Sequence, residues 1–153
     1  MIVLFALACG ALLPDLDEQP EPLEKTVQVH TDLDILGKYI TIPHGLSSVR
    51  FAAKPRGRSS SVPGPTDLEL LAWWPLDEAG WQQLEPLLGP AGEVGTFRAS
   101  PELTTAVLPP DVAAEPGSIE GTLYAATAFE NIFWSGHWAV RAPGGLALHM
   151  YNR

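Results

Sequence analysis

The clearest pattern in the chain is an apolar run that leads directly into a helical periodicity. Residues 67–74 read DLELLAWW, and Glu69 is the only charge within the apolar part of this run. Such a run predicts a strand that lies centrally in a sheet and is covered on both faces. After Pro75, Asp77 is a favourable N-cap for a helix over residues 78–88. One face of this helix is apolar, through Trp81, Leu84, Leu87 and Leu88.

The last third of the chain has the pattern of a β-hairpin. Residues 137–142 and 146–151 both alternate, and Pro143, Gly144 and Gly145 lie between them. We expect each arm to place alternate side chains on one face. These are Trp138, Val140 and Ala142 on the first arm, and Leu146, Leu148 and Met150 on the second.

The rest of the chain gives shorter signals. Residues 26–30, 46–53 and 131–134 are predicted strands, and residues 123–129 are ambiguous between helix and strand. Asp32 or Thr31 is expected to cap one helical turn that ends near Gly37. Residues 91–117 are irregular by composition, except for a short helix in which Ser100 is the cap and Pro101 the first residue.

Together these elements predict one α+β domain over residues 26–153. The expected architecture is an antiparallel sheet with short covering helices and a C-terminal β-hairpin. A chain of 153 residues is a usual size for a single domain. Its 15 prolines and 14 glycines predict short elements with many turns.

Charge and cysteine content narrow the classes of function. The formal net charge is −9, which argues against nucleic-acid binding, because neutralising phosphates requires a basic surface. The single cysteine excludes an intramolecular disulfide. The histidines and carboxylates show no metal-ligand spacing, and no glycine-rich loop has the pattern of a phosphate site, so we expect no cofactor or metal.

The N-terminal region combines an apolar run with an acidic, proline-rich segment. Residues 1–13 are apolar but too short to span a bilayer as a helix, which takes roughly 20 residues. The run has the size of the apolar region of a signal peptide. Residues 14–25 hold three prolines and five acidic residues, which is typical of a solvated tether.

Within this region, residues 5–10 (FALACG) resemble the lipobox of bacterial lipoproteins, with Ala8 before Cys9. The resemblance implies a signal peptide over residues 1–8, a diacylglyceryl group on Cys9 and a lipidated tether over residues 9–25. It also implies a membrane anchor in the cell envelope, and Gly10 after the cysteine favours the outer membrane. Two alternatives remain open: a plain signal peptide, or a buried core element that contains Cys9.

Three groups of side chains are candidates for a binding surface. Trp73 and Trp74 are adjacent on a strand and point to opposite faces, so one of them could join Trp138 in a stacking platform for sugars or peptide. Filling the core is the commoner use of such rings. The basic cluster of Arg50, Lys54, Arg56 and Arg58 could bind an anionic partner or form a solvated loop. His137 and His149 are expected on neighbouring hairpin arms.

These observations favour a non-catalytic, lipid-anchored envelope protein that binds another protein or an envelope polymer. One alternative is a small envelope hydrolase or metal-dependent enzyme centred on His137 and His149, which requires the two imidazoles to converge beside an acid. Another is a periplasmic immunity protein or inhibitor, for which an acidic surface would be suitable. No catalytic residue is assigned from the sequence.

Overall fold

The computed structural model describes residues 26–56, 67–113, 115–131 and 134–152. It contains a six-stranded antiparallel sheet in the order β1-β2-β6-β5-β4-β3. The α+β class and the antiparallel sheet are therefore confirmed. The strands are β1 (Arg50–Pro55), β2 (Leu68–Pro75), β3 (Val94–Arg98), β4 (Ser118–Tyr124), β5 (Gly136–Ala142) and β6 (Gly145–Tyr151).

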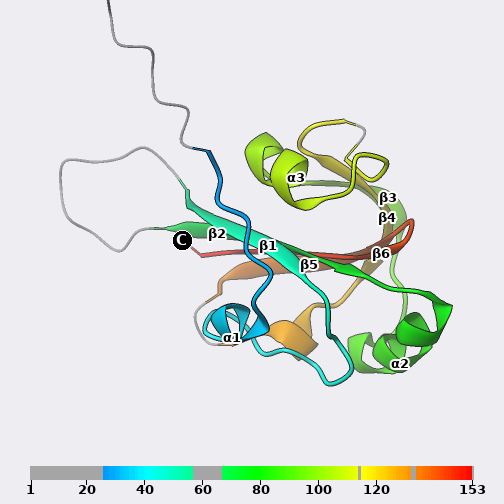
Figure 1. Cartoon of the computed structure of the whole chain (residues 1–153). Coiled ribbons are helices and arrows are strands. Elements are labelled where there is room, and N and C mark those ends of the chain that lie inside the picture. Colours follow the sequence, from blue (N-terminus) through cyan, green and yellow to red (C-terminus); the bar gives the residue numbers. More distant parts are fainter. Residues whose placement is uncertain (1–25, 57–66, 114, 132–133, 153) are drawn as a thin grey trace, which may run out of the picture.

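Helices cover both faces of the sheet (Figure 1). One face packs against α1 (Leu33–Leu36), α2 (Glu78–Leu88) and the 3₁₀ turn η1 (Thr127–Phe129). The opposite face packs against α3 (Pro101–Val107), and we call it the α3 face. Each face has its own hydrophobic core, so a strand in the middle of the sheet must be apolar on both sides.

Strand β2 fulfils this requirement. It lies between β1 and β6, and residues 69–74 are all buried. Trp73 belongs to the core on the α3 face and Trp74 to the core on the other face. The prediction of a central, doubly covered strand is confirmed.

Helix α2 spans the predicted residues 78–88. Asp77 caps it through a carboxylate oxygen that accepts a hydrogen bond from the Gly80 N–H at 2.8 Å. Trp81 and Leu84 are buried against the sheet, but Leu87 is 49% exposed. The expectation that Leu87 belongs to the apolar face is wrong, because the buried stripe of the helix is narrower than the periodicity suggested.

The C-terminal hairpin forms as expected, but its turn is one residue shorter. Ala142 pairs with Gly145, so only Pro143 and Gly144 connect the arms, and Gly144 has a φ of 81°. A shift of one residue in register moves every side chain of an arm to the other face. In the observed register Trp138 lies opposite His149, and both side chains point to the α3 face. Leu148 points to the core on the other face.

Near the N-terminal side of the domain, the local predictions are partly right. Asp32 caps α1 as expected, through hydrogen bonds from the N–H groups of the first turn. Residues 26–30 do not form the predicted strand and contribute one isolated bridge, between His30 and Phe51. The strand predicted over residues 46–53 begins only at Arg50 and extends to Pro55.

Two further predictions are wrong in the middle and last thirds of the chain. Residues 91–117 contain β3, an edge strand whose side chains are half-buried or exposed, which weakens its hydrophobic signal. The predicted strand at residues 131–134 is absent at Asn131 and Trp134, and residues 132–133 lie outside the described part. The ambiguous segment 123–129 divides between the end of β4 and η1.

The predicted lipid anchor falls on residues that the structure does not describe. Cys9, the predicted signal peptide and the predicted tether all fall within residues 1–25. Among the described residues, no helix has both the length and the apolar character needed to cross a bilayer.

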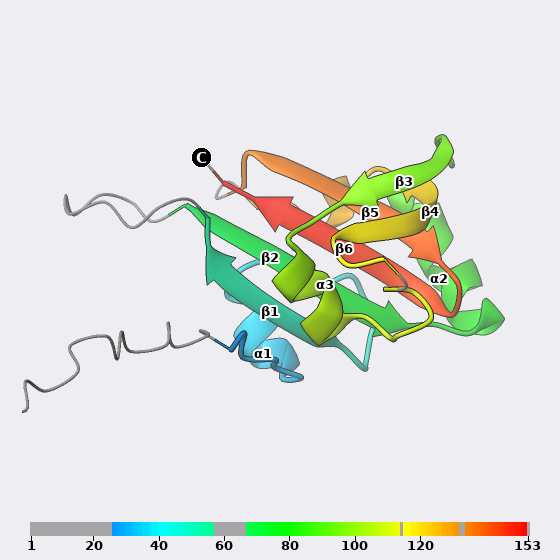
Figure 2. The ribbon, with the colours of Figure 1, turned by 90° about the horizontal axis from the view of Figure 1, so that it is seen from above.

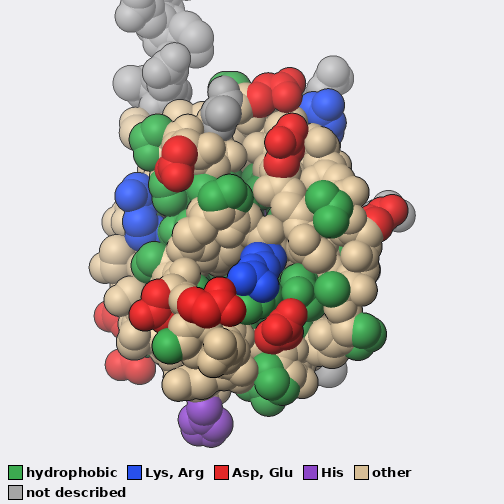
Figure 3. Space-filling view, turned by 90° about the vertical axis from the view of Figure 1, so that its right-hand side faces the viewer, with side chains coloured by type: hydrophobic (Ala, Val, Ile, Leu, Met, Phe, Trp, Pro, Cys, Tyr) green, Lys and Arg blue, Asp and Glu red, His purple; other side chains and the backbone are tan. Residues whose placement is uncertain are grey.

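On the side of the molecule seen in Figure 3, acidic side chains are distributed widely, with a few basic ones among them.

The close approach of β4 and β5 gives a test of the fold. A Cβ atom at Gly121 would lie 2.1 Å from the Arg141 carbonyl oxygen, so Gly121→Ala must displace backbone. We expect a loss of about 2 kcal/mol or more in the free energy of unfolding, measured by urea denaturation. Gly95 is the cross-strand partner of Gly121, and a Cβ there meets nothing nearer than 3.9 Å. Gly95→Ala is the matched control, and equal stability losses in the two variants would contradict the described pairing.

Candidate functional site

A buried polar pair interrupts the core on the α3 face. Glu69 on β2 and His149 on β6 are each only 5% exposed. The His149 Nε2 lies 2.8 Å from the Glu69 Oε1. Neighbouring positions on the same strands are filled by Leu71 and Ala147, which are fully buried. The pair is therefore a polar exception in these two interior strands.

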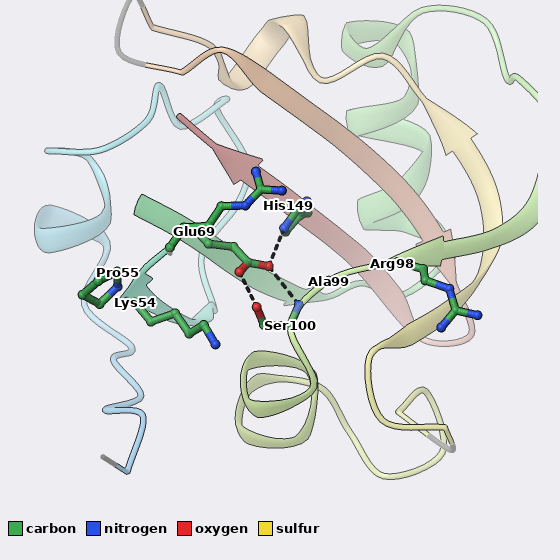
Figure 4. Close-up of a pocket in the computed structure, with 8 residues that line it drawn as sticks. Lys54, Pro55, Glu69, Arg98, Ala99, Ser100 and His149 are labelled. Atoms are coloured by element: carbon green, nitrogen blue, oxygen red, sulfur yellow. Dashed lines mark hydrogen bonds and ion pairs between the residues drawn. The ribbon is translucent and has the colours of Figure 1, made fainter. Parts of the chain in front are cut away.

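Ser100 completes this polar cluster from the segment that precedes α3. Its backbone N–H donates to the Glu69 Oε1 at 2.8 Å, and its hydroxyl donates to the Glu69 Oε2 (Figure 4). Ser100 is the residue before α3 and Pro101 is the first residue of the helix, as predicted. The hydroxyl does not cap the helix, however, because it is hydrogen-bonded to the carboxylate of Glu69.

These contacts determine the charge of Glu69. Burial raises the pKa of its carboxyl group, but hydrogen bonds from His149 and Ser100 outweigh this effect and lower the pKa from 4.5 to about 2. An ionised carboxylate only accepts hydrogen bonds, so the His149 Nε2 carries the proton in their contact. The His149 Nδ1 is buried and has no hydrogen-bond partner in the described part of the chain.

The polar cluster lies in the wall of a cavity of about 410 Å³. Two cations from the end of β1 contribute to the wall. Lys54 forms an ion pair of 2.9 Å with Glu102, and the Arg56 guanidinium lies 4.3 Å from the centre of the Tyr151 ring. The complete lining is Lys54, Pro55, Arg56, Glu69, Arg98, Ala99, Ser100 and His149. Figure 4 shows the Arg98 side chain pointing away from the polar cluster.

A row of aromatic rings borders the end of the sheet at which the cavity lies. The centre of the His149 ring lies 4.8 Å from that of Trp138 and 5.7 Å from that of Tyr151. Phe97 extends the row, with its ring centre 5.9 Å from that of Trp138. Trp138, Tyr151 and Phe97 are half-buried. In Figure 2, α3 lies over β1 and β2 and leaves the end of β6 beside the C-terminus uncovered.

The predicted aromatic residues divide between core and site. Trp73 is 3% exposed and Trp74 is fully buried, and they point to opposite faces as expected. Of the two interpretations, filling of the core is the one that the structure supports, because helices cover both faces of β2. Trp138 is the predicted tryptophan that borders the cavity residue His149.

The basic cluster predicted from the sequence does not act as one group. The Arg50 guanidinium donates to the Ala106 carbonyl oxygen at 2.8 Å and so ties β1 to α3. Lys54 and Arg56 line the cavity. Arg58 lies outside the described residues.

The two predicted histidines do not form a common centre. His137 pairs with Met150 in the hairpin register, so its side chain lies on the face opposite that of His149. It contacts Glu130 instead, with 2.5 Å between the His137 Nε2 and the Glu130 Oε1. The convergence of the two imidazoles beside one acid, which the hypothesis of an enzyme centred on His137 and His149 requires, is therefore not found. No group of three or more His, Cys, Asp or Glu side chains suited to a metal ion occurs in the described ranges.

Glu69 and Ser100 are site residues that the sequence analysis did not assign. Glu69 had a recognisable signal, since it is a lone charge in a strand predicted to be covered on both faces. Ser100 had no sequence signal that pointed to a site, because a serine before a proline is well explained as a helix start.

The charge of Glu69 leads to a prediction for the dependence of stability on pH. Because its pKa is lower in the folded state, ionised Glu69 stabilises the fold above about pH 5, and this contribution disappears as the pH falls to about 2. A shift from 4.5 to about 2 corresponds to about 3 kcal/mol. We expect Glu69→Gln to be less stable at neutral pH and to lose less stability on acidification, measured by urea denaturation at several pH values.

The control for this measurement is Glu102→Gln, because the Glu102 side chain is 60% exposed. Its loss should cost less than about 1 kcal/mol at any pH. If Glu69→Gln and the unsubstituted chain lose stability in parallel on acidification, the buried carboxylate is not ionised in the fold.

Comparison of the chain with protein-family models, with curated proteins and with solved structures finds no match, so the case for a function depends on the geometry of this site.

Proposed function

We propose that this protein is a lipid-anchored cell-envelope protein whose domain binds an envelope polymer without converting it chemically. The lipobox-like residues 5–10 support the anchor, with Cys9 as the lipidated residue. The acidic, proline-rich residues 14–25 support a tether between the membrane and the domain. The cavity beside the aromatic row supplies the binding site.

The single observation that carries the binding function is the buried Glu69 carboxylate, hydrogen-bonded to Ser100 and His149 in the wall of a cavity. Burying a carboxylate in a central strand is costly unless hydrogen bonds compensate it. An apolar residue at this position would suit the buried strand and would need no compensating hydrogen bonds. The polar cluster is therefore best explained by a ligand that it recognises from the cavity wall.

The same contacts favour binding over catalysis. A carboxylate with a pKa of about 2 is a weak base near neutral pH, and Ser100 donates its hydroxyl proton to that carboxylate. A serine nucleophile is activated by an adjacent general base that takes its proton, most often an imidazole. Here His149 and Ser100 both contact Glu69, so the carboxylate occupies the central position.

The aromatic row favours a polymer as the ligand. Half-buried rings offer flat apolar surfaces with polar groups at their margins, which suits the faces of sugar rings in a glycan. The rings lie along one end of the sheet rather than inside the cavity alone, so a ligand longer than the cavity can extend across them.

The anchor is tested by metabolic labelling with a palmitate analogue. We expect the full chain to take up label and to sediment with membranes, because acyl chains on Cys9 hold it at the bilayer. Cys9→Ser should take up no label and remain in the soluble fraction. Ala11→Ser, which leaves the cysteine in place, is the control. Soluble, unlabelled protein in all three cases would refute the anchor.

The binding function is tested by co-sedimentation with purified, insoluble cell-wall glycan. The full chain, kept in a mild non-ionic detergent, should sediment with the glycan. Trp138→Ala should weaken this binding about tenfold, which corresponds to about 1.4 kcal/mol. Leu87→Ala removes an exposed apolar side chain from α2, on the other face, and should have no effect. No sedimentation, or equal losses in the two variants, would refute polymer binding at this site.

A further inference from the structure

We propose that the cavity selects an acidic saccharide, with its anionic group bound by Lys54 and Arg56, its hydroxyl groups near Glu69 and its ring against the aromatic row. This inference rests on the proposed polymer-binding function and specifies the chemistry of the ligand. It follows from three features of the cavity wall: available cations, a carboxylate with spare acceptor capacity, and half-exposed rings.

The cations at the end of β1 have partners that a ligand can replace. Lys54 is paired with Glu102, whose side chain is 60% exposed and can return to solvent. Within the described ranges, the Arg56 guanidinium has no carboxylate partner and rests on the Tyr151 ring. An anion bound here would therefore leave no buried charge unpaired. Arginine suits this role because its planar guanidinium binds a carboxylate through two parallel hydrogen bonds.

Glu69 determines what the rest of the ligand must be. It is negatively charged, so a simple anion placed against it would be repelled. A carboxylate offers about four acceptor positions. The Ser100 N–H, the Ser100 hydroxyl and the His149 Nε2 occupy three of them. A ligand hydroxyl can donate to the remaining position, so the chemistry favours a molecule that joins an anionic group to hydroxyl donors.

The rings and the cavity size indicate that these groups belong to a sugar. The Tyr151 ring contacts both Arg56 and His149, so a ligand whose anionic group binds Arg56 would have its adjoining ring close to the aromatic row. The volume of about 410 Å³ is in the usual range for a small-molecule site. A sugar acid has the flat carbon face, the hydroxyl groups and the carboxylate that these surroundings would bind.

The inference is tested by isothermal titration calorimetry of the full chain in a mild non-ionic detergent. The two probes are a galacturonate trisaccharide and maltotriose, which is similar in size but neutral. We expect the acidic probe to bind with a Kd at least tenfold lower than that of the neutral probe. Arg56→Gln and Lys54→Met should each remove most of this preference. Arg141→Gln should leave it unchanged, because Arg141 lies over Trp81 and pairs with Glu78 on α2.

The outcomes distinguish this inference from the function on which it rests. Equal affinity for the two probes would overturn the acidic ligand, while glycan binding that depends on Trp138 would leave the proposed function intact. A preference that survives both Arg56→Gln and Lys54→Met would overturn the assigned anion site. Failure of both probes to bind, together with failure of the chain to sediment with glycan, would overturn the inference and the proposed function together.

Discussion

The structure depends on the burial of both faces of two interior strands, β2 and β6. Strands β2 and β6 are neighbours in the sheet, and helices pack against both sides of the sheet that they form. Away from the strand ends, residues on these strands must be apolar whichever way they point, because both faces are buried there. This explains why Trp73 and Trp74, which are adjacent in the chain, are both buried. It also makes any charge on these strands costly, which is why Glu69 and His149 stand out.

The elements that could be predicted from the sequence are those whose signals are local. Strand β2 and helix α2 follow from a nearly continuous apolar run, a capping aspartate and a clear periodicity. Strand β3 could not be predicted, because an edge strand with half-exposed side chains has little hydrophobic contrast. The failed strand at residues 26–30 shows the converse. Its alternating β-branched residues favour an extended chain, yet the segment is joined to the sheet by an isolated bridge, between His30 and Phe51.

The candidate site could be predicted only in part, because its residues meet through long-range pairing. Glu69 and His149 are 80 residues apart in the chain, and only the β2–β6 pairing brings them together. The error over His137 has a simpler origin. With Pro143, Gly144 and Gly145 all in the turn, His137 and His149 would share a face. The actual two-residue turn places them on opposite faces.

The strand order also constrains how the molecule is made. Strand β6 is the sole link within the sheet between the β1–β2 pair and the β5–β4–β3 meander. Until residues 145–151 have left the ribosome, the two parts have no shared hydrogen-bonded edge, and most of the core residues on β2 lack their neighbours. When an interior strand is the last one in the chain, the sheet forms late and depends on non-local contacts. Completion of the sheet therefore depends on the last of its six strands along the chain.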